Sequence, residues 1–312
     1  IIAKLCCFNF FFIYFIFKFM CGIAGYITIG KYSNSLFEKN AIDLKKIMKN
    51  RGPDQQGSFR KSRKNYSVNF FSSRLSIIDL DKRSNQPFHS GNHVLVFNGE
   101  IYNYLEIRKT LESKGVKFKT LSDTEVLIKS YQYWGKNCTK YFDGMWAFAI
   151  YDYLKEEVFL SRDNFGEKPL YYGWQGHGSS AAFIFGSELS SLRRHPCFSA
   201  QIDRNALSSY MRHTCVGGVN SIYEGIYKLL PGNILRVSTT DQQPITKAWW
   251  SVLKAIKTGE AKPFLGTAED AVVTLEEVLR GAVERQMMSD VPLGAFLSGG
   301  VDSSAIVALM QS

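Results

Sequence analysis

The sequence has 312 residues, a length that suggests about two domains. Apolar residues make up 45% and charged residues 21%, a balance that excludes collagen-like, low-complexity and wholly disordered chains. The net charge is +10, but the basic residues are scattered, and the densest group, Arg60 to Lys64, is interpreted as a solvated turn. The six cysteines lack zinc-binding spacing and are too few for a disulfide framework, so a reducing cytoplasm fits them.

The N-terminal segment, Ile1 to Phe19, differs from the rest because it holds seven of the 23 phenylalanines. Its uncharged run, Leu5 to Phe17, has 13 residues, fewer than the ~20 apolar residues that span a bilayer. Composition alone leaves three alternatives open for this segment: a signal peptide, a weak membrane anchor or translated upstream sequence.

Hydrophobic periodicity predicts strands and helices through the first two thirds of the chain. Strands are predicted over residues 21–29 and 94–97, and helices over 37–49, 103–114 and 124–134. Further strands are predicted over 145–151, 158–161, 170–174 and 182–185. Helices together with a cluster of strands indicate a layered α+β domain.

A second unit is predicted after a polar stretch, Thr239 to Gly266, which is interpreted as a linker that follows a capped helix over residues 203–212. Thr267 to Asp270 has the pattern of a capping box at the start of a strong helix. A strand over Leu293 to Leu297 then leads through Ser298 to Ser303 into another helix. One strand between two helices cannot close a core, so residues 267–312 are interpreted as the opening of a second domain.

Cys21, after Met20 and before Gly22, has two interpretations. Most lone cysteines are small buried hydrophobic residues. The alternative is a nucleophile that uses its own α-amine as the base, because an α-amine titrates near pH 7.7–8.0 and lies within reach of its own thiol. That mechanism requires Cys21 to be the first residue of the mature protein.

Three further motifs each combine a structural and a functional interpretation. Arg51-Gly52-Pro53-Asp54-Gln55 fits a turn that ends a helix, or an arginine placed to hold a carboxylate. Asn98-Gly99 fits a hairpin turn, or an oxyanion hole made of a side-chain amide and the next backbone N–H. Ser122-Asp123-Thr124-Glu125 fits a helix N-cap, or a carboxylate for a substrate ammonium.

The last motif is Ser298-Gly299-Gly300-Val301-Asp302-Ser303, between a predicted strand and a predicted helix. It lacks the Gly-Lys-Ser/Thr ending of the Walker loop, but its glycines and serines suit an anion at a helix N-terminus. The alternative is a plain strand–helix turn. Asp302 would repel a bare phosphate and fits a magnesium ligand or a structural cap.

In this order the motifs resemble the glutamine-hydrolysing asparagine synthetases, which join an N-terminal-nucleophile glutaminase domain to an ATP-pyrophosphatase synthetase domain. The resemblance runs from Cys21 to the last residue. It includes the stretches Arg74 to Asp79, Asp143 to Ala149, Arg162 to Tyr172 and Gly186 to Leu189.

The resemblance implies a role for each motif. Cys21 is the expected nucleophile, with Asn98 and the N–H of Gly99 as the oxyanion hole. Arg51 is expected to hold the glutamine α-carboxylate, in a pocket shaped by Gly52, Pro53, Asp54 and Gln55. Glu100 and Asp123 are expected to hold the α-ammonium group. The ATP phosphates are expected at Leu297, Ser298, Gly299, Gly300, Asp302 and Ser303.

The implied fold is α+β, a four-layer αββα glutaminase domain followed by the start of an α/β synthetase domain. The expected divisions are 1–20 as a removed or extraneous segment, 21–205 as the glutaminase, 206–266 as a connection and 267–312 as an incomplete synthetase. The implied reaction amidates aspartate with ammonia from glutamine. ATP, bound with magnesium, is expected as a substrate of the synthetase domain, and neither a prosthetic group nor a resident metal is expected. No nucleic-acid or membrane partner is expected, and the oligomeric state stays open, with a homodimer as one alternative.

Three departures qualify the resemblance: the residues that precede Cys21, Ser73 where the family often has a basic residue or His, and the incomplete synthetase. A glutaminase without synthetase activity is therefore expected for these 312 residues, with translation starting at Met20 and the preceding residues as upstream sequence. The alternatives are a related amidotransferase that acts on a cell-envelope sugar or another metabolite, a non-catalytic glutamine-binding module, and a membrane-anchored protein.

Overall fold

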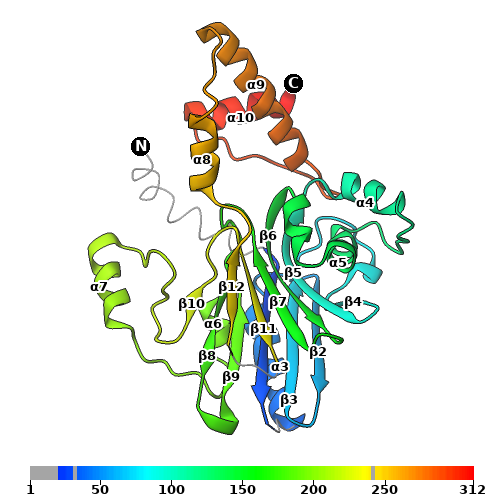
Figure 1. Ribbon diagram of the computed structural model, residues 1–312, viewed down its shortest axis with the longest axis vertical. Helices are drawn as coiled ribbons and strands as arrows, with labels where there is room; N and C mark the ends of the chain where they lie inside the picture. Colours follow the sequence, from blue (N-terminus) through cyan, green and yellow to red (C-terminus); the bar gives the residue numbers. More distant parts are fainter. Residues whose placement is uncertain (1–19, 31–33, 240–242) are drawn as a thin grey trace.

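The computed structural model of the chain describes residues 20–30, 34–239 and 243–312. The predictions for Ile1 to Phe19 therefore lie outside the described residues. Two six-stranded sheets form the body of the molecule, and a group of helices from the C-terminal part lies at one end of it (Figure 1).

Sheet A contains the N-terminal strand at its centre. Its members are β1 (Gly22–Ile29), β2 (Gln55–Ser62), β3 (Tyr66–Arg74), β8 (Tyr171–Gln175), β9 (Ala182–Gly186) and β10 (Tyr227–Lys228). They pair antiparallel in the order β10-β8-β9-β1-β3-β2. All residues of β1 except the last are buried, because the strand is covered on both faces.

Sheet B is also antiparallel, with the order β12-β11-β7-β6-β5-β4. Its members are β4 (Phe88–Ser90), β5 (His93–Ile101), β6 (Gly144–Asp152), β7 (Glu157–Arg162), β11 (Asn233–Ser238) and β12 (Ile245–Ala248). The strands predicted over 145–151 and 158–161 are confirmed as β6 and β7.

Helices cover the outer face of each sheet. On sheet A lie α3 (Asn34–Met48) and α6 (Leu189–Leu192), and on sheet B lie α4 (Tyr104–Glu112) and α5 (Asp123–Trp134). Further elements are η1 (Lys82–Ser84), η2 (Gly135–Tyr141), η3 (Gly178–Ser180) and α7 (Arg204–His213). The α7 helix is capped by Asp203, as its sequence predicts.

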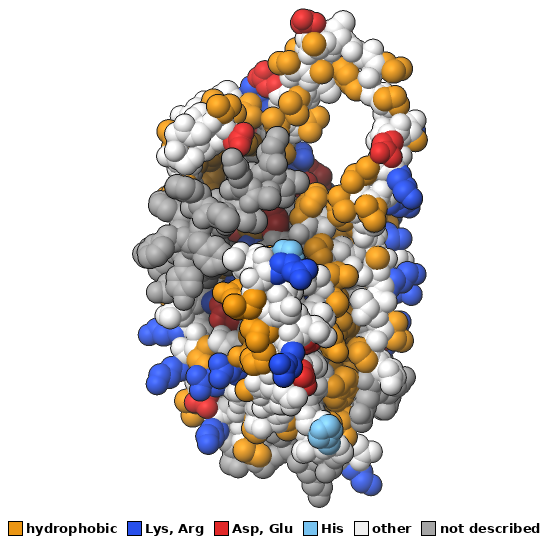
Figure 2. Space-filling model, turned by 90° about the vertical axis from the view of Figure 1, so that its left-hand side faces the viewer, with side chains coloured by type: hydrophobic (Ala, Val, Ile, Leu, Met, Phe, Trp, Pro, Cys, Tyr) orange, Lys and Arg blue, Asp and Glu red, His pale blue; other side chains and the backbone are white. Residues whose placement is uncertain are grey.

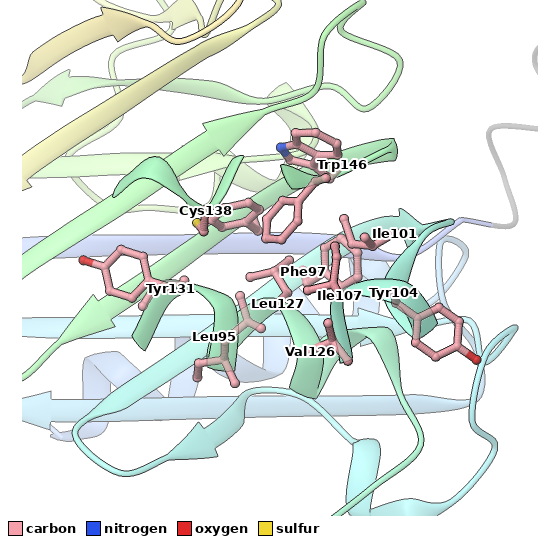
Figure 3. Packing of buried hydrophobic residues seen from close by; sticks show 14 of the residues in the cluster. Leu95, Phe97, Ile101, Tyr104, Ile107, Val126, Leu127, Tyr131, Cys138 and Trp146 are labelled. Carbon is pink, nitrogen blue, oxygen red and sulfur yellow. The ribbon is translucent and has the colours of Figure 1, made fainter. Parts of the chain in front are cut away.

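Three apolar layers hold these elements together, because residues along each strand alternate between the two faces of its sheet. Between the sheets, Phe70 and Phe185 of sheet A meet apolar residues of sheet B such as Val96. Leu95 and Phe97, on the opposite face of β5, pack under α4 and α5 (Figure 3). A third layer lies between sheet A and α3. The predicted αββα architecture is therefore confirmed.

Three local predictions are wrong. Asn98-Gly99 does not form a hairpin turn but lies within β5, paired with Ala147 and Trp146 of β6. The predicted linker, Thr239 to Gly266, contains β12 and the helix α8 (Val252–Glu260), because β12 pairs with β11 at the edge of sheet B. Leu293 to Leu297 forms no strand, since no neighbouring strand in the described chain pairs with it.

The hairpin of β2 and β3 is not predicted by the sequence analysis. Its two strands pair along their whole length, from Gln55 opposite Arg74 to Ser62 opposite Ser67. The basic residues from Arg60 to Lys64 lie at its tip, as the interpretation of a solvated turn requires. β2 escapes prediction because its polar residues do not alternate with apolar ones.

The C-terminal helices are α8, α9 (Ala268–Gln286) and α10 (Val301–Gln311). The capping box at the start of α9 is confirmed, with reciprocal hydrogen bonds between Thr267 and Asp270. Hydrophobic side chains gather at the surface of this end of the molecule (Figure 2). In the part of the chain that the structure describes, every helix is too short or too polar to cross a membrane.

Three polar contacts of the described residues join the C-terminal part to the body, and Met288 also packs against the apolar layer under α4 and α5. The Nε atom of Arg285 lies 2.8 Å from Oδ2 of Asp143. The backbone N–H of Asp290 donates to the carbonyl of Ile77 at 3.0 Å, and its carboxylate accepts from the N–H of Asp79 at 2.6 Å. Asp290 therefore holds both sides of the loop that contains Ile78.

The layer between the sheets provides a stability prediction. Phe70 is fully buried there and packs edge-on against Phe185, with the two ring centroids 5.5 Å apart. We expect Phe70→Ala to lower the free energy of unfolding by about 3–5 kcal/mol, because it removes apolar contacts and leaves a cavity. Phe165→Ala is the matched control, since Phe165 is 71% exposed. Urea unfolding that shows equal losses for the two variants would contradict this account.

Candidate functional site

A cavity of about 340 Å³ opens at one end of the two sheets, where β1 begins and β5 ends. It collects residues from both sheets and from the start of α5. Those that matter for its chemistry are Cys21, Arg74, Leu75, Gln86, Asn98, Gly99, Glu100, Asp123 and Lys168. The structure therefore brings five of the residues predicted for glutamine hydrolysis into one cavity.

Cys21 lies directly before β1, and its thiol is held by one neighbour. The N–H of Leu75 donates to Sγ at 3.2 Å, and Sγ lies 3.4 Å from the carbonyl oxygen of the same residue. Burial raises the pKa of the thiol above its ordinary value, which Arg74 and Lys168 partly offset by their positive charge. A neutral thiol in this setting needs a base before it can attack a carbon.

Asn98 and Gly99 face this cavity from β5. The side chain of Asn98 is 1% exposed, and its Nδ2 has no hydrogen-bond partner among the described residues. Gly99 has a φ of 152°, and a Cβ there would lie 2.0 Å from the carbonyl oxygen of Met145, so no other residue fits. A buried amide donor without a partner beside a thiol suits an oxygen that becomes negative during reaction.

The motif from Gly52 to Gln55 does not line the cavity but contacts the residues next to its wall. A Cβ on Gly52 would lie 2.4 Å from the carbonyl of Ser73, so the two backbones touch. The carboxylate of Asp54 accepts from the N–H of Ser76 at 2.8 Å, and Gln55 Nε2 donates to the carbonyl of Gln86 at 2.8 Å. The remaining member, Pro53, is exposed.

Arg51 lies outside the lining of the cavity. Two of its guanidinium nitrogens have partners elsewhere, and Nη2 is buried without a hydrogen-bond partner among the described residues. Its Nε donates to the carbonyl of Cys21 at 3.0 Å, and its Nη1 lies 2.8 Å from Oε1 of Glu188. Arg51 therefore holds the backbone of Cys21 rather than the space beside its thiol.

Arg74, unlike Arg51, lies on the wall of the cavity, next to Leu75. Its Nη2 donates to the carbonyls of Ile78 and Asp79, at 3.0 and 2.6 Å, and this fixes the guanidinium. Arg74 belongs to one of the stretches that carry the family resemblance, but its sequence context assigns it no role. Two arginines each beside a polar turn cannot be told apart without the fold.

Lys168 is a second lining residue that the sequence analysis does not select. It lies in a motif quoted for the resemblance, and its side chain is only 5% exposed. Burial lowers the pKa of its amino group, while Glu100 and Cys21 act in the opposite direction. A buried lysine close to a cysteine is a typical perturbed group of a functional site.

Two carboxyl groups line the same cavity. Asp123 is the first residue of α5, and its Oδ2 accepts from the N–H of Ile101 at 3.1 Å. Burial raises its pKa to about 7, and Glu100 adds to the rise. Burial also raises the pKa of Glu100. Ser122 caps α5 by accepting from the N–H of Glu125, so the N-cap interpretation holds beside the functional one.

The loop from Leu297 to Ser303 lies at the start of α10, and none of its residues lines the cavity. Its serines are joined, since Ser298 Oγ lies 3.0 Å from Ser303 Oγ, and Ser303 donates to the carbonyl of Gly300. Gly299 has a φ of 79°, and Asp302 is exposed in the first turn of the helix. The described residues hold no cluster of three or more His, Cys, Asp and Glu side chains suited to a metal.

The raised pKa of Asp123 provides a prediction about pH. Its folded-state pKa of about 7 exceeds the ordinary value of 3.8, so the folded protein keeps a proton that the unfolded chain loses as pH rises. As pH rises from about 4 to 7, the contribution of this group to the free energy of unfolding therefore falls, and the loss remains above pH 7. The parent protein should lose unfolding free energy between pH 5 and pH 8. In Asp123→Asn, which cannot titrate at this position, we expect that loss to be smaller by on the order of 2 kcal/mol.

Urea unfolding at the two pH values measures this difference. Asp43→Asn, on the half-exposed side of α3, controls for the removal of one carboxylate. An Asp123→Asn variant with the same loss as the parent protein would show that Asp123 titrates at its ordinary pKa.

Two protein families match this chain. Residues 20–250 match the glutamine amidotransferase domain, and residues 274–312 match the asparagine synthase family. Among solved structures, an allosteric regulatory enzyme of purine biosynthesis superposes with a TM-score of 0.50 at 18% identity, covering 74% of this chain and 49% of that one. This likeness supports the fold alone.

Curated relatives extend the match. A Methanocaldococcus jannaschii protein, whose name assigns it provisionally to the glutamine-hydrolysing asparagine synthetases, is 36% identical over 94% of this chain and 57% of its own length. Asparagine synthetase 3 of Bacillus subtilis is 33% identical over 93% of this chain and 45% of its own. The chain spans about half the length of these relatives. Because the glutamine amidotransferase model matches residues 20–250, most of the chain, the chain belongs to the glutamine amidotransferase family.

Proposed function

We propose that the cavity at Cys21 hydrolyses glutamine to glutamate and ammonia, and that the whole protein uses this ammonia to make asparagine. One observation carries the proposal: the Cys21 thiol and the unpartnered amide of Asn98 share a cavity with two cationic and two carboxyl side chains. A nucleophile, an oxyanion donor and charges of both signs are what a zwitterionic amide substrate requires.

The reaction has two stages. The α-amine of mature Cys21 takes the thiol proton, and Sγ attacks the side-chain carbonyl carbon of glutamine. Asn98 Nδ2 and the N–H of Gly99 stabilise the resulting oxyanion. The C–N bond then breaks as the α-ammonium returns the proton to the leaving nitrogen, which departs as ammonia. Water attacks the thioester with the α-amine again as base, and the sulfur leaves with that proton as glutamate is released.

Recognition of the amino acid end uses the charged groups of the cavity. We assign the glutamine α-carboxylate to Arg74, which lines the cavity, in place of Arg51, which does not. The α-ammonium is assigned to Asp123, with Glu100 beside it. An ammonium next to Asp123 lowers the pKa of that carboxyl from about 7, so binding of substrate favours the charged form.

The synthetase half is proposed from the family. The loop from Leu297 to Ser303, with Gly299, Gly300, Asp302 and two serines at a helix N-terminus, is assigned to the ATP phosphates. In the whole protein, magnesium enters with ATP as substrate. The side-chain carboxylate of aspartate attacks the α-phosphate of ATP and releases pyrophosphate, and ammonia then displaces AMP from the resulting aspartyl adenylate to give asparagine. We propose that the glutaminase domain, expected at residues 21–205, extends to residue 248, because β11 and β12 belong to sheet B. This shortens the connection expected at 206–266, and residues 267–312 are proposed as part of the synthetase domain.

We place the reaction in the cytoplasm, since a catalytic thiol must stay reduced. Cys21, Cys138, Cys197 and Cys215 are free, which supports such a compartment. The sequence leaves the oligomeric state open, with a homodimer as one alternative.

The first test concerns the nucleophile and the oxyanion donor. In protein whose mass shows that it begins at Cys21, we expect Cys21→Ala to abolish release of ammonia from glutamine. Asn98→Ala should lower kcat by about 100–1000-fold with little change in KM, because one oxyanion donor is lost. Asn205→Ala, at an exposed position in α7, is the matched control. Ammonia release that survives Cys21→Ala would overturn the proposal.

The second test separates the two arginines. Arg74→Lys should raise KM for glutamine by about tenfold or more, because a lysine ammonium cannot keep the planar donor group that the carbonyls of Ile78 and Asp79 hold in place for a carboxylate. With 4-aminobutanamide, which lacks the α-carboxylate, Arg74→Lys and the parent should have similar kcat/KM. Arg51→Lys should be impaired with both substrates, since Arg51 holds the Cys21 backbone. The reverse pattern would return the carboxylate to Arg51.

A further inference from the structure

Lys168 is the one lysine on the wall of the Cys21 cavity among the described residues. Its Nζ lies 3.8 Å from the sulfur of Met20, the residue bonded to the Cys21 nitrogen. The side chain is almost wholly buried, so water does little to weaken its charge. The amino group therefore lies inside the cavity, beside the residue that precedes the nucleophile, and not in solvent.

The backbone holds Lys168 in this place. Its N–H donates to Oδ2 of Asp163 at 3.0 Å, and its carbonyl accepts from Nε of Arg162 at 2.8 Å. The same Asp163 carboxylate accepts from the N–H groups of Trp146 and Phe165. A loop tied at both ends to β6 and β7 fixes the direction from which the lysine approaches the cavity.

The charges around Cys21 come from several elements. Asp123 at the start of α5 and Glu100 at the end of β5 bring negative charge to the cavity, and both would favour a protonated α-amine. Arg74 lines the cavity with positive charge, and Arg51 contacts the Cys21 carbonyl. Glu167 is next to the lysine in the chain. An arginine that binds the substrate carboxylate is neutralised by it. Lys168 then remains as a cation of the cavity, with Glu100 among the negative charges that act on it.

We propose that the positive charge of Lys168 keeps the α-amino group of mature Cys21 in its neutral form, so that this amine can act as the base. The proposal rests on the proposed glutamine hydrolysis. A cation close to an amine disfavours a second positive charge there and so lowers the pKa of that amine. Lys168 is then a positioning residue for a proton, since it acts through Cys21 and needs no contact with the substrate.

Two observations favour this role over a purely structural one. A buried lysine is costly unless it is paired, and apolar residues would fill the same volume without that cost. The amino group lies 3.8 Å from the sulfur of Met20, the residue joined to the Cys21 nitrogen, and among the described residues no carboxylate lies at ion-pair distance from it. Glu100, which also lines the cavity, favours the charged form of the lysine.

The test is the pH dependence of kcat/KM for glutamine between pH 5 and 9. In Lys168→Met we expect the midpoint of the acidic limb to rise by about one unit, because the α-ammonium loses its cationic neighbour. Below that limb kcat/KM should fall roughly tenfold, and above it the variant should approach the parent. Lys168→Arg keeps the charge and should restore the parent's midpoint, and Lys254→Met, exposed on α8, should leave it unchanged.

The outcomes separate this inference from the proposed function. Parent protein that releases no ammonia, or Cys21→Ala that still does, would overturn the glutaminase itself. An active parent whose Lys168→Met variant loses kcat/KM equally at every pH, or keeps the same midpoint, would overturn the role of Lys168 alone. Lys168→Gln is measured in parallel, with circular dichroism as the check on folding. If both neutral variants fail to fold while Lys168→Arg folds, the lysine is structural and the proposal falls.

Discussion

The register between β1 and β3 is the constraint on which the site depends. Gly22 pairs with Ser73, so the chain places Cys21 at the level where β3 ends at Arg74 and Leu75 follows. A slip of one residue would turn every side chain of β1 to the opposite face and would separate the thiol from the N–H that holds it. The register is specified because β1 is buried on both faces, so each of its side chains has an apolar layer to fill.

Sequence motifs that are distant in the chain contact this strand and hold it in place. The turn after α3 lies against the backbone of Ser73, and Arg51 from that turn holds the carbonyl of Cys21. Asn98 is placed by a different sheet, through the pairing of β5 with β6. The thiol and the amide therefore meet only because the two sheets pack face to face. The geometry of the site is a property of the packing between sheets A and B.

The cavity contains buried ionisable groups that lower the stability of the fold. Asp123 and Lys168 are both buried, and burial disfavours the charged form of each. Burying these charged groups lowers stability, but buried charges act more strongly than exposed ones on a bound zwitterion and on the Cys21 amine. The loop beside the cavity is also tied to the C-terminal part, since Asp290 bonds to Ile77 and Asp79. The wall at Ile78 is thus held from both parts of the chain.

The sequence by itself determined the chemical types present and most of the periodic elements. A cysteine next to a methionine, an Asn-Gly pair and a glycine-rich loop carry their chemistry locally, and strands such as β6 are apolar enough to be recognised. Periodicity could not detect β2, because its polar residues are stabilised by pairing with β3. The predicted strand at Leu293 fails for the opposite reason, since it has no partner in the described chain.

Only the tertiary structure decided which charged residues face the thiol. Arg51 and Arg74 are both arginines beside polar turns, and the sequence distributes them without any sign of which will reach the cavity. Their places follow from long-range pairing: Glu188 and the Cys21 carbonyl engage Arg51, while the end of β3 brings Arg74 to the cavity wall. Lys168 joins them from a loop far along the chain. Local patterns identify a reactive side chain, but the electrostatic field around it is built from residues that only folding brings together.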